Sequence, residues 1–237
     1  LSFFGQYLRW WLRSRCQPYF VYPGAPGTLG ILGYVNAAFE IKAQLEAAGT
    51  PEPEAIFVAV GSCGTFAGLL LGARLAGLGS RIVGVRIIEE EVANRNKIVR
   101  MVNRAARYLH RRDPSVPRIT IEAAEVDLLD GYLGEGYAHP TSEAQQAVRL
   151  VAEAEGLPLE TTYTGKAMAA LLDHAAQHPG SQLLFLDTFT ESTLLDDGDY
   201  RALPEKFWAV FDPAHEVGCW CLRAWRDPAF CWKRSEE

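Results

Sequence analysis

The chain alternates between short apolar runs and longer segments in which apolar and polar positions follow a helical pattern. Residues 56–60 are all apolar, as are most of residues 81–88, and such runs suit strands that are buried on both faces. Helices are expected at 31–48, 66–78, 91–111, 141–154 and 165–178, a third buried strand at 181–187 and an edge strand at 118–123. This alternation of strands and helices predicts an α/β fold with a parallel sheet.

The turn between the first strand and its helix is rich in glycine and hydroxyl residues, with the sequence Gly61-Ser62-Cys63-Gly64-Thr65. Small residues let backbone N–H groups and the positive end of the helix point at one anion, so the turn predicts a phosphorylated ligand. No lysine follows the second glycine, as a nucleoside-triphosphate loop requires, and the glycines miss the spacing of dinucleotide folds. The same kind of turn also occurs in ordinary strand-to-helix connections.

Composition narrows the class of protein. The 237 residues are 49% hydrophobic and 22% charged, which is typical of a globular chain, and no apolar run reaches membrane-spanning length. The net charge of -6 without a lysine-arginine block argues against nucleic-acid binding. Five cysteines at irregular spacing favour a reducing compartment, and we therefore expect a cytoplasmic protein.

Four segments in the same order resemble one group of pyridoxal-phosphate enzymes, which includes 1-aminocyclopropane-1-carboxylate (ACC) deaminase and D-cysteine desulfhydrase. The segments are residues 24–34, 61–68, 134–140 and 163–169, the last of which begins Tyr163-Thr164-Gly165-Lys166. The resemblance implies a doubly wound parallel sheet of the tryptophan synthase beta-like type (fold type II), present only in part. It also implies three regions: a remnant of a smaller α/β domain at 1–23, the large cofactor-binding domain at 24–195 and a C-terminal appendix at 196–237.

The resemblance assigns roles to nine residues. It implies that Gly61, Ser62, Cys63, Gly64 and Thr65 bind the phosphate of pyridoxal 5'-phosphate, that Thr164 and Thr188 face its ring, and that Tyr137 and Tyr163 are catalytic groups beside the substrate's reacting carbon. Deaminases of this group carry a glutamate where this chain has Thr164, and a neutral hydroxyl there makes the cofactor a weaker electron sink. This favours the desulfhydrase branch, in which α,β-elimination from a small amino acid gives a keto acid and ammonia.

The lysine that forms the Schiff base in this family lies far upstream of the glycine turn, and no lysine here matches it. Lys42 is the first lysine and is expected on the exposed side of a helix, and Lys166 is expected to anchor a carbonyl or a surface carboxylate rather than to act as the nucleophile. The chain starts at Leu1 within an amphipathic pattern and is expected to be a fragment. Two alternatives therefore stay open: a truncated or decayed relative that binds the cofactor without catalysis, and an ACC deaminase-type hydrolase.

Other residues carry weaker signals. His139 could shuttle a proton, although a loop hydrogen bond is its commoner use. His215, Cys219, Cys221 and Cys231 match no familiar zinc spacing, so buried thiols beside tryptophans are expected and no metal is. The tryptophan-rich segment at 208–232 could provide a dimer contact, and a homodimer is expected.

Overall fold

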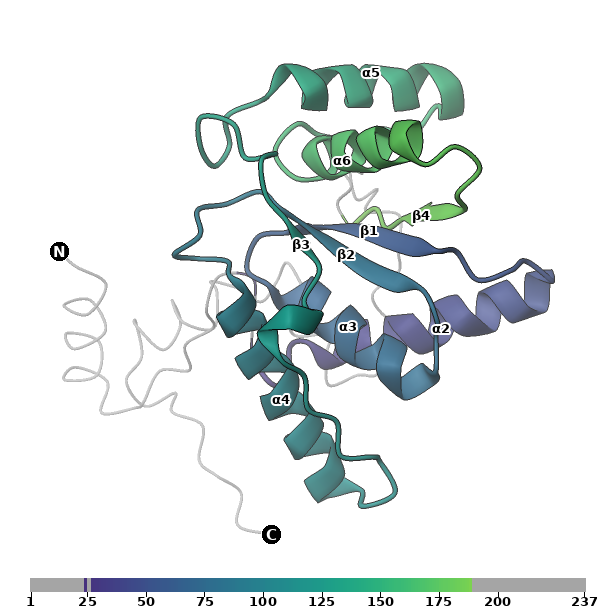
Figure 1. The fold of residues 1–237 in the computed structure, drawn as a ribbon, viewed down its shortest axis with the longest axis vertical. Helices are drawn as coiled ribbons and strands as arrows, with labels where there is room; N and C mark the ends of the chain where they lie inside the picture. The colour runs from purple at the N-terminus through teal and green to yellow at the C-terminus, as the bar shows by residue number, and fades with distance from the viewer. Residues whose placement is uncertain (1–23, 25–26, 189–237) are drawn as a thin grey trace, which may run out of the picture. The chain divides into compact units, whose positions relative to one another are not determined.

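A four-stranded parallel sheet lies at the centre of the part of the chain that the structure describes, which is residue 24 and residues 27–188 of a computed structural model (Figure 1). Its strands are β1 (Ala55–Val60), β2 (Arg81–Arg86), β3 (Leu128–Leu129) and β4 (Leu183–Phe185), in the order β3-β2-β1-β4. β1 pairs with β2 along its full length and with β4 at residues 55–57. The central place of β1 explains why its sequence is apolar throughout.

Helices cover both faces of this sheet. On one side lie α2 (Leu32–Ala48), α3 (Gly64–Ala76) and α4 (Arg95–Arg112), and on the other lies α6 (Thr164–Gln177) with α5 (Ser142–Glu155) packed against it (Figure 1). The sheet is therefore doubly wound, as predicted.

The side chains of β1 alternate between two cores, although all six are buried. One core, which includes residues of α2, α3 and α4, takes Ile56, Val58 and Val60; the other, which includes residues of α6, takes Ala55, Phe57 and Ala59. Full burial of a large apolar side chain contributes about 1.5–3 kcal/mol to folding. A strand between two cores thus gains from apolar residues at both odd and even positions.

Two glycines bring α3 close to α2. A Cβ atom on Gly68 would lie 2.5 Å from the carbonyl oxygen of Ile31, and one on Gly72 would lie 2.4 Å from that of Val35. Because these glycines are four residues apart, they lie on one face of the helix. Their close contact sets where α3 begins relative to α2.

Two of the predicted strands need correction. Residues 118–123 form no strand, because both backbone groups of Ile121 are bonded to the side-chain amide of Asn103 in α4, at 2.9 and 3.0 Å. A short 3-10 turn, η1 (Ala123–Glu125), and then β3 follow instead. The strand predicted at 181–187 is shorter, at Leu183–Phe185, and half-buried rather than buried.

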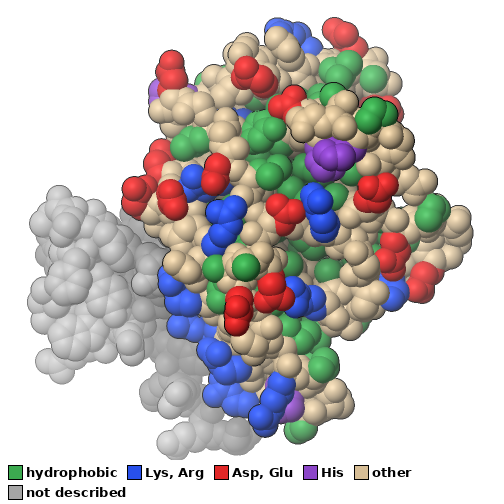
Figure 2. All heavy atoms as spheres, viewed as in Figure 1, with side chains coloured by type: hydrophobic (Ala, Val, Ile, Leu, Met, Phe, Trp, Pro, Cys, Tyr) green, Lys and Arg blue, Asp and Glu red, His purple; other side chains and the backbone are tan. Residues whose placement is uncertain are grey.

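α4 is amphipathic and carries most of the charge on this side. It begins after Asn94, whose side chain accepts a hydrogen bond from the backbone N–H of Lys97 at 2.9 Å, which is why it starts later than predicted. Lys and Arg side chains gather over this helix in Figure 2. Among the described residues, no helix is both long enough and apolar enough to cross a membrane. The expectations for residues 1–23 and 196–237, including the cysteines of the tail, lie outside the described residues.

Candidate functional site

The candidate site lies at the carboxyl edge of the parallel sheet, where open α/β folds bind their ligands. β1 ends there in the turn 61–63, and β2 ends in a loop that contains Glu89. The start of α6 reaches the same place, because a Cβ atom on Gly61 would lie 3.2 Å from Cε1 of Tyr163. The loop 131–140 joins them through a 3.2 Å hydrogen bond from the backbone N–H of Tyr137 to Oε1 of Glu89.

The turn before α3 leaves the first helical N–H groups open. Its N-cap residue, Cys63, has a left-handed backbone with φ of 75°, and no side chain caps the helix. The first helical bond runs from the N–H of Ala67 to the carbonyl of Cys63, at 3.0 Å. Within the described residues, no acceptor therefore takes the N–H groups of residues 64–66, which are the groups that an anion binds at a helix start.

Neighbouring segments pack closely against the small residues of this turn. A Cβ atom on Gly24 would lie 2.5 Å from Oγ of Ser62, so the loop at residue 24 approaches the turn closely. Gly61 faces the ring of Tyr163 in the same way. The hydroxyls of Ser62 and Thr65 have no hydrogen-bond partner within the described residues. The backbone and hydroxyl donors of residues 61–65 thus fit a phosphate group.

Cys63 contributes its backbone to the turn rather than a reactive thiol. The side chain is 1% exposed, and burial raises the pKa of the thiol, an effect that Lys97 and a hydrogen bond from Asn94 partly oppose. The protonated Sγ lies 3.9 Å from the carbonyl oxygen of Gly61. A buried, protonated thiol is inert as a nucleophile.

Tyr137 and Tyr163 meet beside this turn. Their hydroxyl groups share a short hydrogen bond, and their rings pack edge to face with centroids 5.8 Å apart. Burial raises the pKa of Tyr163 to about 12, and the bond to Tyr137 acts in the same direction. Tyr163 is therefore protonated at neutral pH and is a proton donor rather than a base there.

Glu160 closes the start of α6. Its carboxylate accepts hydrogen bonds from the backbone N–H groups of Thr162, Tyr163 and Thr164, at 2.6–2.7 Å. The hydroxyl of Thr164, which is 1% exposed, is bonded to Glu160 as well. A contact of Thr164 with a cofactor ring therefore stays a prediction. Sequence reasoning missed Glu160, because glutamate is not among the favoured N-cap residues.

Thr188 lies at the same edge of the sheet but on its surface. It follows β4, and the N–H of Leu186 extends the pairing of that strand by a 2.9 Å hydrogen bond to the carbonyl of Phe57. Thr188 is exposed. Its predicted contact with the cofactor ring therefore stays a prediction as well.

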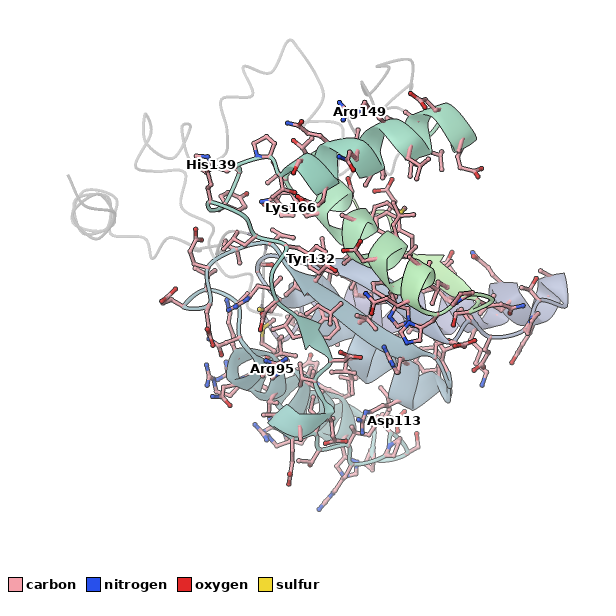
Figure 3. The ribbon with its side chains drawn as sticks, turned by 45° about the horizontal axis from the view of Figure 1, so that its top comes forward. Arg95, Asp113, Tyr132, His139, Arg149 and Lys166 are labelled. Carbon is pink, nitrogen blue, oxygen red and sulfur yellow. The ribbon has the colours of Figure 1, made fainter. Side chains whose placement is uncertain are left out.

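The lysines of residues 27–188 are all bonded to backbone carbonyls. Lys166 is fully buried and donates to the carbonyl oxygens of Leu133 and Gly136, at 2.7 and 3.4 Å, which confirms its predicted role as an anchor (Figure 3). Lys42 is half-buried rather than exposed and donates to the last carbonyls of α3, and Lys97 donates to Val92.

His139 lies in the loop as an exposed residue. Its Nδ1 is 4.0 Å from a carboxylate oxygen of Glu135, and its backbone N–H donates to Gly136. At 4.0 Å the ring contact is longer than a hydrogen bond, so the side-chain hydrogen bond expected of His139 stays a prediction. No group of three or more potential metal ligands occurs within the described residues.

Comparison with known proteins finds one family and several solved structures. The family model described as pyridoxal-phosphate dependent enzyme matches residues 8–188. A crystal structure titled as the ACC deaminase homologue is 30% identical with a TM-score of 0.61, over 76% of this chain and 52% of that one. A fungal L-serine ammonia-lyase from Rhizomucor miehei is 18% identical with a TM-score of 0.41, over 67% of this chain and 51% of that one. The chain thus spans about half the length of the solved structures that it matches.

Proposed function

The chain belongs to the family of pyridoxal-phosphate dependent enzymes, and on that premise we propose that it is the cofactor-binding part of a lyase for small amino acids. The reaction is of the D-cysteine desulfhydrase type, in which D-cysteine and water give pyruvate, ammonia and hydrogen sulfide. The protein acts as a homodimer in the cytoplasm.

The observation that carries this proposal is the open start of α3 beside two bonded tyrosines. The N–H groups of residues 64–66 and the positive helix end suit a phosphate dianion, and the hydroxyls of Ser62 and Thr65 add two donors. When bound, pyridoxal phosphate supplies a ring that withdraws electrons from the substrate's α-carbon.

The tyrosine pair holds and moves a proton next to that position. Tyr163 keeps its proton at neutral pH, because burial and the bond to Tyr137 raise its pKa to about 12. Tyr137 is 40% exposed and can exchange a proton with substrate or solvent. Thr164 adds no charge, which favours elimination of a good leaving group over the opening of a cyclopropane ring.

The phosphate assignment is tested by comparing two ligands. Pyridoxal phosphate and pyridoxal differ only in the phosphate, so we expect the full chain to bind the former at least about 100-fold more tightly, as measured by equilibrium dialysis. This factor corresponds to about 3 kcal/mol, or one to two charge-assisted hydrogen bonds. Equal affinities would contradict a phosphate site at residues 61–65.

A second candidate is a relative that binds the cofactor without catalysis. The observation that favours it is that Lys42, Lys97 and Lys166 are all engaged with backbone carbonyls. We infer that the family's catalytic lysine is absent from this chain. Borohydride reduction of the chain with pyridoxal phosphate, followed by peptide mass spectrometry, should then find no lysine adduct, and D-cysteine should release no sulfide. An adduct on Lys166 would overturn this second candidate.

A further inference from the structure

The loop that carries Tyr137 has little order of its own. Residues 131–140 contain three glycines with positive φ and Ala138 with φ of 63°, and most of the loop is exposed. Within it, one backbone bond joins the N–H of His139 to the carbonyl of Gly136, at 3.3 Å. Something outside the loop must therefore hold the phenol of Tyr137 against Tyr163.

One peptide group in this loop is held at both ends by charged side chains. Its carbonyl, that of Gly136, accepts from Nζ of Lys166 at 3.4 Å, and its N–H, that of Tyr137, donates to Oε1 of Glu89 at 3.2 Å. Lys166 also binds the carbonyl of Leu133, at 2.7 Å. The two charges approach from different elements, the start of α6 and the loop after β2.

Burying the ammonium group of Lys166 costs free energy. Its side chain is 0% exposed, and a buried ammonium must be fully hydrogen-bonded. Burial lowers the pKa of Lys166, while the nearby carboxylates of Glu160 and Glu89 act in the opposite direction. Figure 3 shows Lys166 at the start of its helix, close to the loop that carries His139. Within the part of the chain that the structure describes, both hydrogen bonds of Nζ go to the loop that carries Tyr137, at Leu133 and Gly136.

We propose that Lys166 and Glu89 are positioning residues that clamp the Gly136–Tyr137 peptide and thereby hold the hydroxyl of Tyr137 on that of Tyr163. The importance of this clamp for proton transfer rests on the proposed function. The clamp itself does not, because it can be measured in the chain without cofactor.

The test uses the ionisation of Tyr163 as its readout. The chain is labelled with ζ-13C tyrosine, and Tyr163 is assigned in the NMR spectrum by its loss in Tyr163→Phe. In the unaltered chain this resonance should titrate near pH 12, because the bond from Tyr137 contributes to its raised pKa. Tyr137→Phe removes that bond and should move the titration to lower pH.

Glu89→Ala should move the Tyr163 titration in the same direction as Tyr137→Phe, and Glu89→Gln, which keeps an acceptor oxygen, should restore part of the shift. Glu89 is exposed, so these variants should fold. Lys166→Met should act like Glu89→Ala, and neither should add to Tyr137→Phe. The neighbouring exposed residue provides the matched control, Glu91→Ala, which should change nothing.

The clamp is overturned if Glu89→Ala leaves the Tyr163 titration where it was while Tyr137→Phe moves it. In the double variants, the effect of Glu89→Ala should not add to that of Tyr137→Phe if Glu89 acts through Tyr137. Additive effects would indicate a general loosening of the fold instead. Failure of pyridoxal phosphate to bind would count against the proposed function and would leave this result standing.

Discussion

Two helices begin near the carboxyl edge of the sheet, and they treat their first N–H groups in opposite ways. α6 starts under the carboxylate of Glu160, which accepts three backbone hydrogen bonds, two from the residues just before the helix and one from its first residue, Thr164. α3 starts after Cys63 with no side-chain cap at all. Both helix starts are made of buried and half-buried residues, so the difference does not come from exposure to water.

The contrast separates a structural helix end from a binding one. A protein carboxylate already neutralises the positive end of α6, so that end is unavailable to a ligand anion. The end of α3 keeps its partial positive charge, its donors have no acceptor among the residues that the structure describes, and small residues surround it. Backbone donors that find no partner cost free energy where water does not reach them, and a bound phosphate would supply acceptors.

The largest expected effect comes from making α3 resemble α6. Thr65→Asp places a carboxylate in the first turn of α3, where it repels a phosphate dianion by about 3 kcal/mol at an effective dielectric constant between those of protein surface and water. Affinity for pyridoxal phosphate should fall about 100-fold. The same change should raise the free energy of unfolding by about 0.3–1 kcal/mol, because an acid suits a helix start.

Thr65→Asn is the matched control for that variant, since it has the shape of aspartate without the charge. It should retain affinity within about tenfold, which is roughly one hydrogen bond to a charged group. Equal losses in the two variants, measured by equilibrium dialysis, would mean that the hydroxyl of Thr65 or the local shape matters and the open helix end does not.

The second-largest effect is expected from removing the carboxylate at the start of α6. Glu160→Ala removes the acceptor of three N–H groups at a half-buried helix start and should lower the free energy of unfolding by about 2 kcal/mol. Urea unfolding measures the loss. Glu160→Gln keeps an acceptor and should lose about half as much.

Glu153→Ala in α5 is the control for loss of a surface charge, because Glu153 is exposed. Such a change should stay within about 0.5 kcal/mol. If Glu160→Ala is no more destabilising than Glu153→Ala, Glu160 is not a cap and the contrast between the two helices disappears.

A smaller effect concerns pH, because Tyr163 is the N-cap residue of α6 and its pKa is raised by burial, by the bond to Tyr137 and, least, by the charge of Glu160. With the pKa raised to about 12 in the folded chain, the unfolded chain loses this proton first as pH rises above about 10. The free energy of unfolding must therefore fall between pH 10 and 12. The slope from one group is at most about 1.4 kcal/mol per pH unit, and solvent reduces it for a half-buried phenol.

Urea unfolding at pH 8, 10 and 11 measures this slope. Tyr163→Phe should be less sensitive to alkali than the unaltered chain, and Tyr137→Phe should lie between the two. Tyr132, whose pKa is also raised to about 12, gives a background slope that all three proteins share. Identical slopes would show that Tyr163 titrates normally in the folded chain.

The open helix end could be predicted from the sequence, and the closed one could not. Residues 56–60 and the turn after them are contiguous, so local patterns suffice to predict a buried strand, a tight turn and a helix start. The cap of α6 depends on a glutamate that bends back over its own chain. Likewise, the missing strand at 118–123 depends on Asn103, which lies 18 residues away from Ile121 in sequence. Local periodicity carries no signal for such distant side-chain contacts.

In the candidate site too, some residues could be predicted from the sequence and their long-range contacts could not. Tyr137 and Tyr163 came from the family resemblance, and the structure brings their hydroxyls together in one hydrogen bond, next to the backbone contacts of Glu89 and Lys166. Glu89 has no sequence signal of its own, because it begins a run of three glutamates, and such a charged run is ordinarily solvated. Thr164 had a predicted role at the ring, yet its hydroxyl is engaged with Glu160.

The smallest expected effect tests whether the open end is made by backbone alone. Cys63 adopts φ of 75°, a conformation that costs a non-glycine residue about 1–2 kcal/mol. Cys63→Gly relieves this strain but loses a buried thiol and loosens the unfolded chain, so the free energy of unfolding should change by less than about 1 kcal/mol. Because the N–H groups of residues 64–66 stay in place, affinity for pyridoxal phosphate should remain within about threefold. Cys63→Val, with a branched side chain at positive φ, should instead lose about 2 kcal/mol of stability and weaken binding. A folded Cys63→Gly chain that binds more than tenfold more weakly would assign part of the site to the thiol, and the contrast with α6 would then concern side chains at both helices.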